Sequence, residues 1–162
     1  MAFPKLTHVF DLVIWGPPGF STSATNNSNL CCAIVDGGKL SSTDGNHEFK
    51  VKCGSDWMIV PMGSRTITID ARVSAEKADG TNLELAYLGK MDITDEVRSL
   101  FDGSSAARET QFGEPYYYTT PRIWSRSDEF AWVNDAVFLA MGKLRLDDNG
   151  QVEAWYRILK VG

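Results

Sequence analysis

The clearest strand signal in the chain is the ten-residue stretch TITIDARVSA, residues 66–75. Its odd-numbered positions from Ile67 to Val73 are apolar, and the residues between them are polar or charged. This period of two is typical of a β-strand with one buried face. The dipeptide Asp79-Gly80 follows, which favours a tight hairpin turn, and residues 82–89 supply a returning strand. The stretch therefore predicts an antiparallel hairpin.

The same period extends in both directions along the chain. Further strands are expected at residues 6–15, 30–35, 48–53, 57–60, 116–124, 131–146 and 152–161. Turns are expected at Asp36-Gly37-Gly38, at Gly54-Ser55-Asp56 and at residues 147–150.

One segment departs from this period. Residues 94–101 begin with a helix-capping Thr94, continue with acidic residues and are followed by Gly103, which predicts a short helix within a long excursion over residues 92–115. Several strands carry apolar residues on both faces, which favours a barrel over a sandwich. The sequence thus predicts an all-β single domain over residues 1–162, a closed antiparallel β-barrel of about 8–10 strands with one short helix.

Composition excludes several classes of partner. The 162 residues include 16 Lys and Arg against 21 Asp and Glu, a net charge of −5, so no nucleic-acid or membrane partner is expected. The first 25 residues do not resemble a secretory signal, and Cys31, Cys32 and Cys53 are interpreted as reduced thiols of a cytoplasmic protein. Two histidines and three cysteines match none of the usual zinc spacings, so no metal is expected.

Sequence motifs for bound cofactors are also missing. There is no glycine-rich phosphate loop, no dinucleotide fingerprint and no nucleophile elbow, so no cofactor is expected. Chemistry then rests on carboxylates, Arg, Tyr and Asn. Asp70 and Arg72 share one strand face and could act as a base beside an oxyanion donor, or form a surface ion pair. Asp56 could be a general base at the entrance of a strand, or a turn residue.

Phenol and amide groups complete the set of candidate catalytic residues. Of Tyr116, Tyr117 and Tyr118, at least one ring must point inward in any register, and Tyr118 is the predicted proton donor. Asn134 shares a predicted face with Trp132 and is a candidate ligand for a substrate oxygen. Packing alone is the alternative role for both.

An aromatic lining is expected for the barrel cavity. The residues predicted to contact a substrate are Trp57, Tyr116, Trp124, Trp132 and Phe138. The polar segment 19–29 is rich in Ser, Thr and Asn and is the candidate lid over this cavity.

Several motifs in order resemble a known family. They are Cys53-Gly-Ser-Asp-Trp57, Asp70-Ala-Arg72, Tyr117-Tyr-Thr-Thr-Pro-Arg122 and Phe130-Ala-Trp-Val-Asn134. Together they resemble the domain of unknown function 3237 family over roughly residues 5–161. The resemblance implies a closed antiparallel barrel of the lipocalin-like or allene-oxide-cyclase-like kind, while the activity of that family is largely unassigned.

Departures from the family pattern concern charged positions. The family usually has an Arg where this chain has Asn29-Leu30-Cys31, a Phe-Glu pair where it has Ile123-Trp124, and an Arg where it has Asp135. If those charges line the family's cavity, this chain has replaced charge with aromatic surface. We therefore expect a pocket for a planar or apolar organic molecule.

Three classes of function remain open at this level. The first is a cofactor-independent isomerase or cyclase acting on a small hydrophobic, polyketide- or terpenoid-like intermediate of secondary metabolism. The alternative is a non-catalytic, lipocalin-like binding protein for an apolar small molecule. A third is an assembly protein whose aromatic outer faces pair in a homo-oligomer, such as a dimer.

Overall fold

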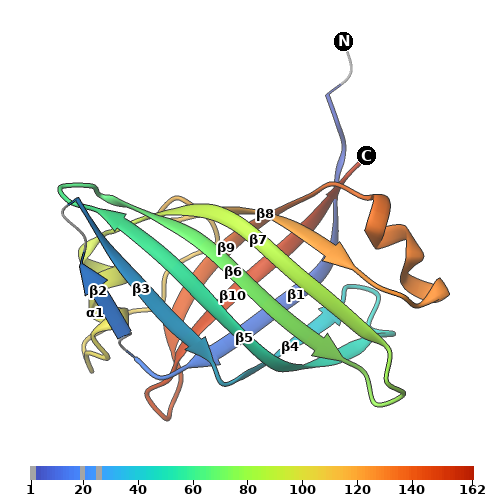
Figure 1. Cartoon of the computed structure of the whole chain (residues 1–162), viewed down its shortest axis with the longest axis horizontal. Helices are drawn as coiled ribbons and strands as arrows, with labels where there is room; N and C mark the ends of the chain where they lie inside the picture. Colours follow the sequence, from blue (N-terminus) through green and yellow to red (C-terminus); the bar gives the residue numbers. More distant parts are fainter. Residues whose placement is uncertain (1–2, 19–20, 25–26) are drawn as a thin grey trace.

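Strands make up most of the computed structural model, which describes residues 3–18, 21–24 and 27–162 (Figure 1). In chain order the elements are β1 (Leu6–Gly16), β2 (Ser21–Ala24), β3 (Ser28–Val35), β4 (Gly37–Ser42), β5 (Glu48–Pro61), β6 (Thr66–Glu76), β7 (Asn82–Asp92), α1 (Asp95–Phe101), β8 (Tyr117–Trp124), the 3-10 helix η1 (Asp128–Asp135), β9 (Phe138–Leu146) and β10 (Val152–Val161). No helix in the described part of the chain is long and apolar enough to cross a membrane.

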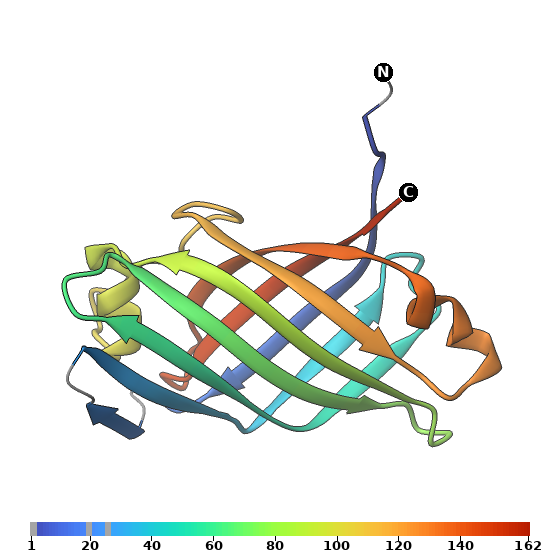
Figure 2. The ribbon, with the colours of Figure 1, turned by 45° about the horizontal axis from the view of Figure 1, so that its top comes forward.

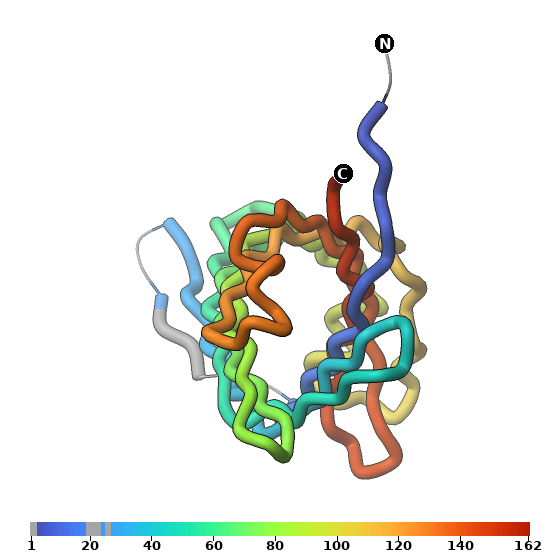
Figure 3. The backbone as a smooth tube through the Cα atoms, turned by 90° about the vertical axis from the view of Figure 1, so that its right-hand side faces the viewer, coloured from blue at the N-terminus to red at the C-terminus, as the bar shows by residue number. Residues whose placement is uncertain are grey.

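The strands form one antiparallel sheet that closes on itself. Its order is β2-β3-β5-β4-β1-β10-β9-β8-β7-β6, and pairing of β5 with β6 joins the two sides. β3 and β4 both pair with β5, each along a different half, so they act as two halves of one barrel strand. The result is a closed eight-strand barrel with β2 as an extra strand on the edge of β3. Figure 3 shows the barrel from one end, with the view along its axis. The predicted barrel is confirmed.

Alternation of the side chains fills the interior. On β6 the inward residues include Ile69 and Ala71, which are fully buried, whereas Asp70 and Arg72 face outward. On β1 the inward set is Phe10, Leu12 and Ile14. This is the two-residue period of the sequence expressed as a core and a surface.

The two helical segments lie at opposite ends of the barrel, as Figure 2 shows. The hydroxyl of Thr94 accepts a hydrogen bond from the N–H of Val97, so this predicted helix and its cap are present. At the other end, η1 inserts Phe130 edge-to-face against Phe49, with ring centroids 5.2 Å apart. Its Glu129 also pairs with Lys77 at 3.2 Å.

Two of the predicted turns are wrong. Their glycines lie within strands, where the missing side chain lets the backbones of neighbouring strands come close together. Gly37 and Gly38 begin β4, and a Cβ added at Gly38 would lie 2.4 Å from the carbonyl oxygen of Val13. Gly54-Ser55-Asp56 lies inside β5, where a Cβ at Gly54 would lie 2.7 Å from the carbonyl oxygen of Arg72. In both places glycine lets neighbouring strands approach, without reversing the chain.

The predicted strand over residues 131–146 is also partly wrong. Only Phe138–Leu146 is a strand, and residues up to Asp135 belong to η1. Phe130 and Val133 are the buried residues of η1, and their spacing of three places both on the helix face that covers the barrel end. The predicted lid partly overlaps β2 and β3, and its residues Gly19, Phe20, Thr25 and Asn26 lie outside the described residues.

Candidate functional site

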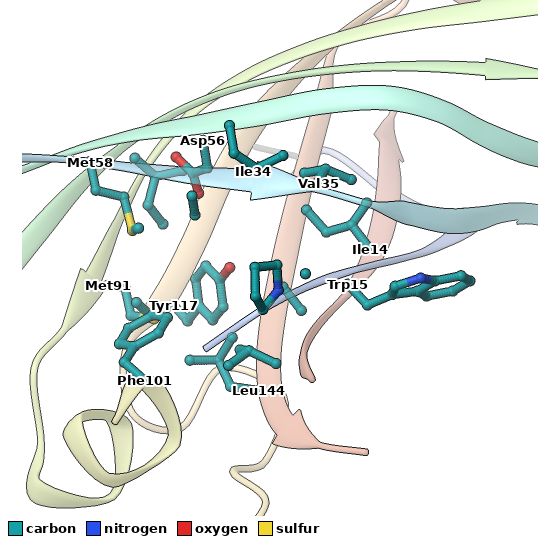
Figure 4. Close-up of a pocket in the computed structure, with 16 residues that line it drawn as sticks. Ile14, Trp15, Ile34, Val35, Asp56, Met58, Met91, Phe101, Tyr117 and Leu144 are labelled. Atoms are coloured by element: carbon teal, nitrogen blue, oxygen red, sulfur yellow. The ribbon is translucent and has the colours of Figure 1, made fainter. Parts of the chain in front are cut away.

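A cavity of about 60 Å³, partly open to solvent, lies in the end of the barrel nearest α1. Its walls are largely apolar, and two polar side chains, Asp56 and Tyr117, reach it (Figure 4). The apolar part includes Ile14, Val35, Met58, Met91, Phe101 and Leu144. An engineered protein cavity that binds benzene measures about 150 Å³, so a ring-sized ligand must displace side chains at the mouth here. The half-buried Phe101 of α1 is the candidate for that movement.

A β-bulge directs Asp56 into this cavity. The register between β5 and β6 shifts between Val51 and Cys53. Before the shift Phe49 and Val51 face inward, and after it Asp56 and Met58 do. One extra residue therefore reverses the alternation of the strand, which is how bulges commonly re-aim side chains near functional sites.

The carboxyl group of Asp56 is buried and incompletely paired. The residue is 8% exposed, and its Oδ1 has no hydrogen-bond partner among the residues that the structure describes. Burial raises the pKa of Asp56 from 3.8 to about 7; a hydrogen bond from the Asp70 backbone opposes this rise, and the negative charge of Asp70 adds to it. Near neutral pH both the acid and the carboxylate are populated, so this group can accept or donate a proton.

Three buried tyrosines form a cluster beside this cavity, which Tyr117 reaches. The hydroxyls of Tyr117 on β8 and Tyr156 on β10 are hydrogen-bonded to each other. Tyr87 on β7 packs on Tyr156 with ring centroids 5.1 Å apart, and the corresponding distance for Tyr117 and Tyr156 is 5.4 Å. Gly142 leaves room for the Tyr117 ring, because a Cβ added there would lie 2.5 Å from it.

Asp56 and the tyrosines are electrostatically linked. Asp56 pairs with Ala71, which pairs with Tyr87, so the carboxyl and this phenol flank one small inward residue. Burial, and after it the charge of Asp56, raises the pKa of both Tyr87 and Tyr117 well above 10. Burial likewise raises the pKa of Tyr156. All three phenols therefore stay protonated and available as hydrogen-bond donors at neutral pH.

Of the predicted catalytic residues, the cavity receives the side chain of Asp56 alone. Asp70 and Arg72 face outward on β6, and Tyr118 is 41% exposed on the outer face of β8. Asn134 lies in η1, where its side chain accepts a hydrogen bond from the Ser125 N–H and donates one to the Ser125 carbonyl.

The residues predicted to contact a substrate lie away from this cavity. Trp57, Tyr116, Trp124 and Trp132 are exposed by 38% or more, and Phe138 is buried beside Trp132 with ring centroids 6.0 Å apart. Arg72 and Trp124 instead share a shallow groove on the outer face of the barrel.

Tyr117 is the polar cavity residue that the sequence reasoning did not select. The sequence did contain an indication. Tyr118 and Arg122 are four residues apart and therefore lie on the same face of the strand, and a charged side chain such as that of Arg122 faces solvent. This arrangement turns Tyr118 outward and Tyr117 inward. Within the described residues no three His, Cys, Asp or Glu side chains gather where a metal ion could bind.

Comparison with known proteins identifies a family and a shared fold. A family model described as "Protein of unknown function (DUF3237)" matches residues 4–161. No curated protein matches the chain.

Several solved structures have the same fold. A conserved protein of unknown function from Rhodopseudomonas palustris has a TM-score of 0.80 at 16% identity, with 100% of both chains covered. A β-barrel-like protein from Acinetobacter baumannii has a TM-score of 0.73 at 16% identity, covering 100% of this chain and 98% of that one. A protein described as an enzyme from Penicillium herquei has a TM-score of 0.62 at 16% identity, covering 100% and 97%. At such identities the likeness shows the fold alone.

Proposed function

We propose a function for this chain, which belongs to the DUF3237 family of proteins of unknown function. The protein is a cofactor-independent isomerase or cyclase. Its substrate is a small hydrophobic, polyketide- or terpenoid-like molecule bound in the barrel cavity. The description of the Penicillium herquei barrel as an enzyme is compatible with catalysis on this fold. The proposed enzyme needs no cofactor and acts in the cytoplasm.

The observation that carries the proposal is the state of Asp56. Its Oδ1 is buried beside an apolar cavity with no partner in the described part of the chain, and burial raises its pKa to about 7. A catalytic acid or base works best when its pKa lies near the working pH, and such perturbed groups concentrate at functional sites. A structural carboxyl would instead have its oxygens paired.

The proposed step is proton transfer at carbon. The Asp56 carboxylate removes a proton from a carbon next to a substrate carbonyl; the C–H bond breaks and its electron pair moves onto the carbonyl oxygen to give an enolate. In isomerisation the substrate carries a C=C bond conjugated with the enolate, and the protonated Asp56 returns the proton to the remote carbon of this dienolate, so that the double bond shifts and the carbonyl reforms. In cyclisation the enolate carbon forms a new bond within the molecule, and the proton goes to the group that accepts the electron pair. Arg72 and Asn134, expected as oxyanion donors, lie outside the cavity and take no part in this step.

Hydrogen–deuterium exchange tests this step without knowledge of the natural substrate. The probe is 2-tetralone, an enolisable bicyclic ketone, followed by proton NMR in D₂O. We expect the wild-type protein to accelerate exchange beside the carbonyl, and Asp56→Asn to lower the acceleration by about 10²-fold or more, the usual range for a general base.

A matched control keeps the result specific. Asp148→Asn makes the same change in an exposed turn and is expected to exchange like the wild type. Equal exchange with the wild type and Asp56→Asn would reject the proposal.

The alternative is a lipocalin-like binding protein, favoured by the mostly apolar wall of the cavity. Native mass spectrometry of the purified protein would reveal a retained apolar molecule. In this case Asp56→Asn changes the affinity for that molecule, while no variant affects exchange of 2-tetralone.

A further inference from the structure

The hydroxyl of Tyr117 reaches the same cavity as the carboxyl of Asp56. Tyr117 is 3% exposed and comes from β8, whereas Asp56 comes from β5 on the other side of the pocket (Figure 4). Tyr156 is equally buried but does not belong to the cavity wall. The two bonded phenols therefore differ in their access to a ligand.

Tyr117 and Tyr156 together carry one more O–H donor than the hydrogen bond between them uses. Each phenol has one O–H donor, and the bond between Tyr117 and Tyr156 uses one of the two. If Tyr156 donates to Tyr117, the O–H of Tyr117 remains free to point into the cavity. The same bond strengthens Tyr117 as a donor, because hydrogen bonds in a chain polarise one another. Buried polar groups left without partners are uncommon and call for an explanation.

We propose that Tyr117 donates a hydrogen bond to the reacting oxygen of the substrate, with Tyr156 as the residue that positions and polarises it. The substrate class is then an enolisable ketone, whose oxygen becomes negative while Asp56 holds the proton from carbon. This inference rests on the proposed function and adds the second half of its site. A donor directed at the oxygen where charge develops is the usual means of stabilising an enolate.

The local structure holds Tyr117 in this position. Its ring lies against Gly142 of β9, where a side chain would collide with it, and Gly142 pairs with Tyr156 of β10. The bare backbone at Gly142 thus lets the Tyr117 hydroxyl reach across to Tyr156. Tyr87 packs against Tyr156, and its buried hydroxyl also finds no hydrogen-bond partner within residues 3–18, 21–24 and 27–162.

Paired probes of one shape test the donor role independently of turnover. Phenol and toluene differ by a hydroxyl in place of a methyl, and their affinities are measured by ligand-observed NMR. We expect the wild type to bind phenol about tenfold more tightly than toluene, the ratio set by about one hydrogen bond. In Tyr117→Phe this preference should vanish while the affinity for toluene stays the same, which also reports an intact cavity.

Tyr156→Phe is the second variant, since it leaves the Tyr117 hydroxyl in place and removes its partner. We expect it to reduce the phenol preference by a few fold without abolishing it. A phenol preference that survives in both variants overturns the inference, as does a wild type that binds neither probe or binds both equally.

The two proposals fail separately. If Asp56→Asn abolishes exchange of 2-tetralone but Tyr117→Phe keeps its phenol preference, the enzyme proposal stands and the role of Tyr117 is wrong. If the phenol preference depends on Tyr117 but exchange does not depend on Asp56, Tyr117 belongs to a binding site without this chemistry.

Discussion

The substitution Asp56→Asn should change how the stability of the protein depends on pH. The folded protein holds this carboxyl with a pKa of about 7, and unfolding returns it toward 3.8. Between about pH 4 and pH 7 the folded chain therefore keeps a proton that the unfolded chain has released. Because the unfolded state binds fewer protons in this window, the free energy of unfolding falls as pH rises.

The size of this effect follows from the rise in pKa. At about 1.4 kcal/mol for each unit of pKa, a rise from 3.8 to about 7 corresponds to about 4 kcal/mol. The penalty is absent below about pH 4, grows through the window, and is complete above about pH 7. An Asn side chain carries no charge at any of these values, so the variant lacks the penalty.

Urea denaturation of both proteins at several pH values from 4 to 8 measures the difference. Relative to the variant, the wild type should lose about 4 kcal/mol of unfolding free energy between the two ends of this range. The exposed Asp148→Asn serves as the control, and its curve should run parallel to that of the wild type. Parallel curves for the wild type and Asp56→Asn would refute the reasoning about the buried carboxyl.

Three further substitutions test the packing around the site and the surface. Gly142→Ala places a Cβ 2.5 Å from the Tyr117 ring, so the free energy of unfolding measured in urea should fall by about 1–3 kcal/mol and the preference for phenol should weaken. If neither the unfolding free energy nor the phenol preference changes, the Tyr117 ring is not crowded by a side chain at position 142. Phe130→Ala removes a buried ring that packs 5.2 Å from Phe49 and should cost about 3–5 kcal/mol, and a loss below about 1 kcal/mol would show that η1 does not seal the barrel end. The homodimer expected from pairing of aromatic outer faces is tested with Trp124→Asp, because Trp124 is 44% exposed on the outer face of β8. Sedimentation should show a dimer for the wild type and a monomer for the variant, and a wild-type monomer at all concentrations would reject the dimer.

Local patterns in the sequence were enough to predict much of the fold. The alternation in residues 66–75, the Asp79-Gly80 turn and the cap at Thr94 depend on neighbouring residues alone, and each appears in the structure. The turns expected at Gly37-Gly38 and Gly54 failed because a glycine signals either a turn or a close approach of two strands. Only the partner strand, distant in sequence, distinguishes these cases.

The candidate site shows the same division. Asp56 was selected as a general base from the sequence, but its inward direction depends on a bulge set by pairing with β6. Tyr118 was expected to face the cavity, but it lies on the same face of β8 as the charged Arg122, so it points to solvent and Tyr117 points inward. A shift of one residue in register sends every side chain of a strand to the opposite face, so small errors in register exchange cavity and surface.

The sequence by itself determined that this chain forms antiparallel strands with one buried face, because the alternation of apolar and polar residues is a local property of each strand. Tertiary structure decided which polar groups meet inside the barrel. Asp56, Tyr117 and Tyr156 come from three strands that are far apart in the chain, and barrel closure and register bring them together. The raised pKa of Asp56 arises from burial by those strands, and no local pattern encodes that burial.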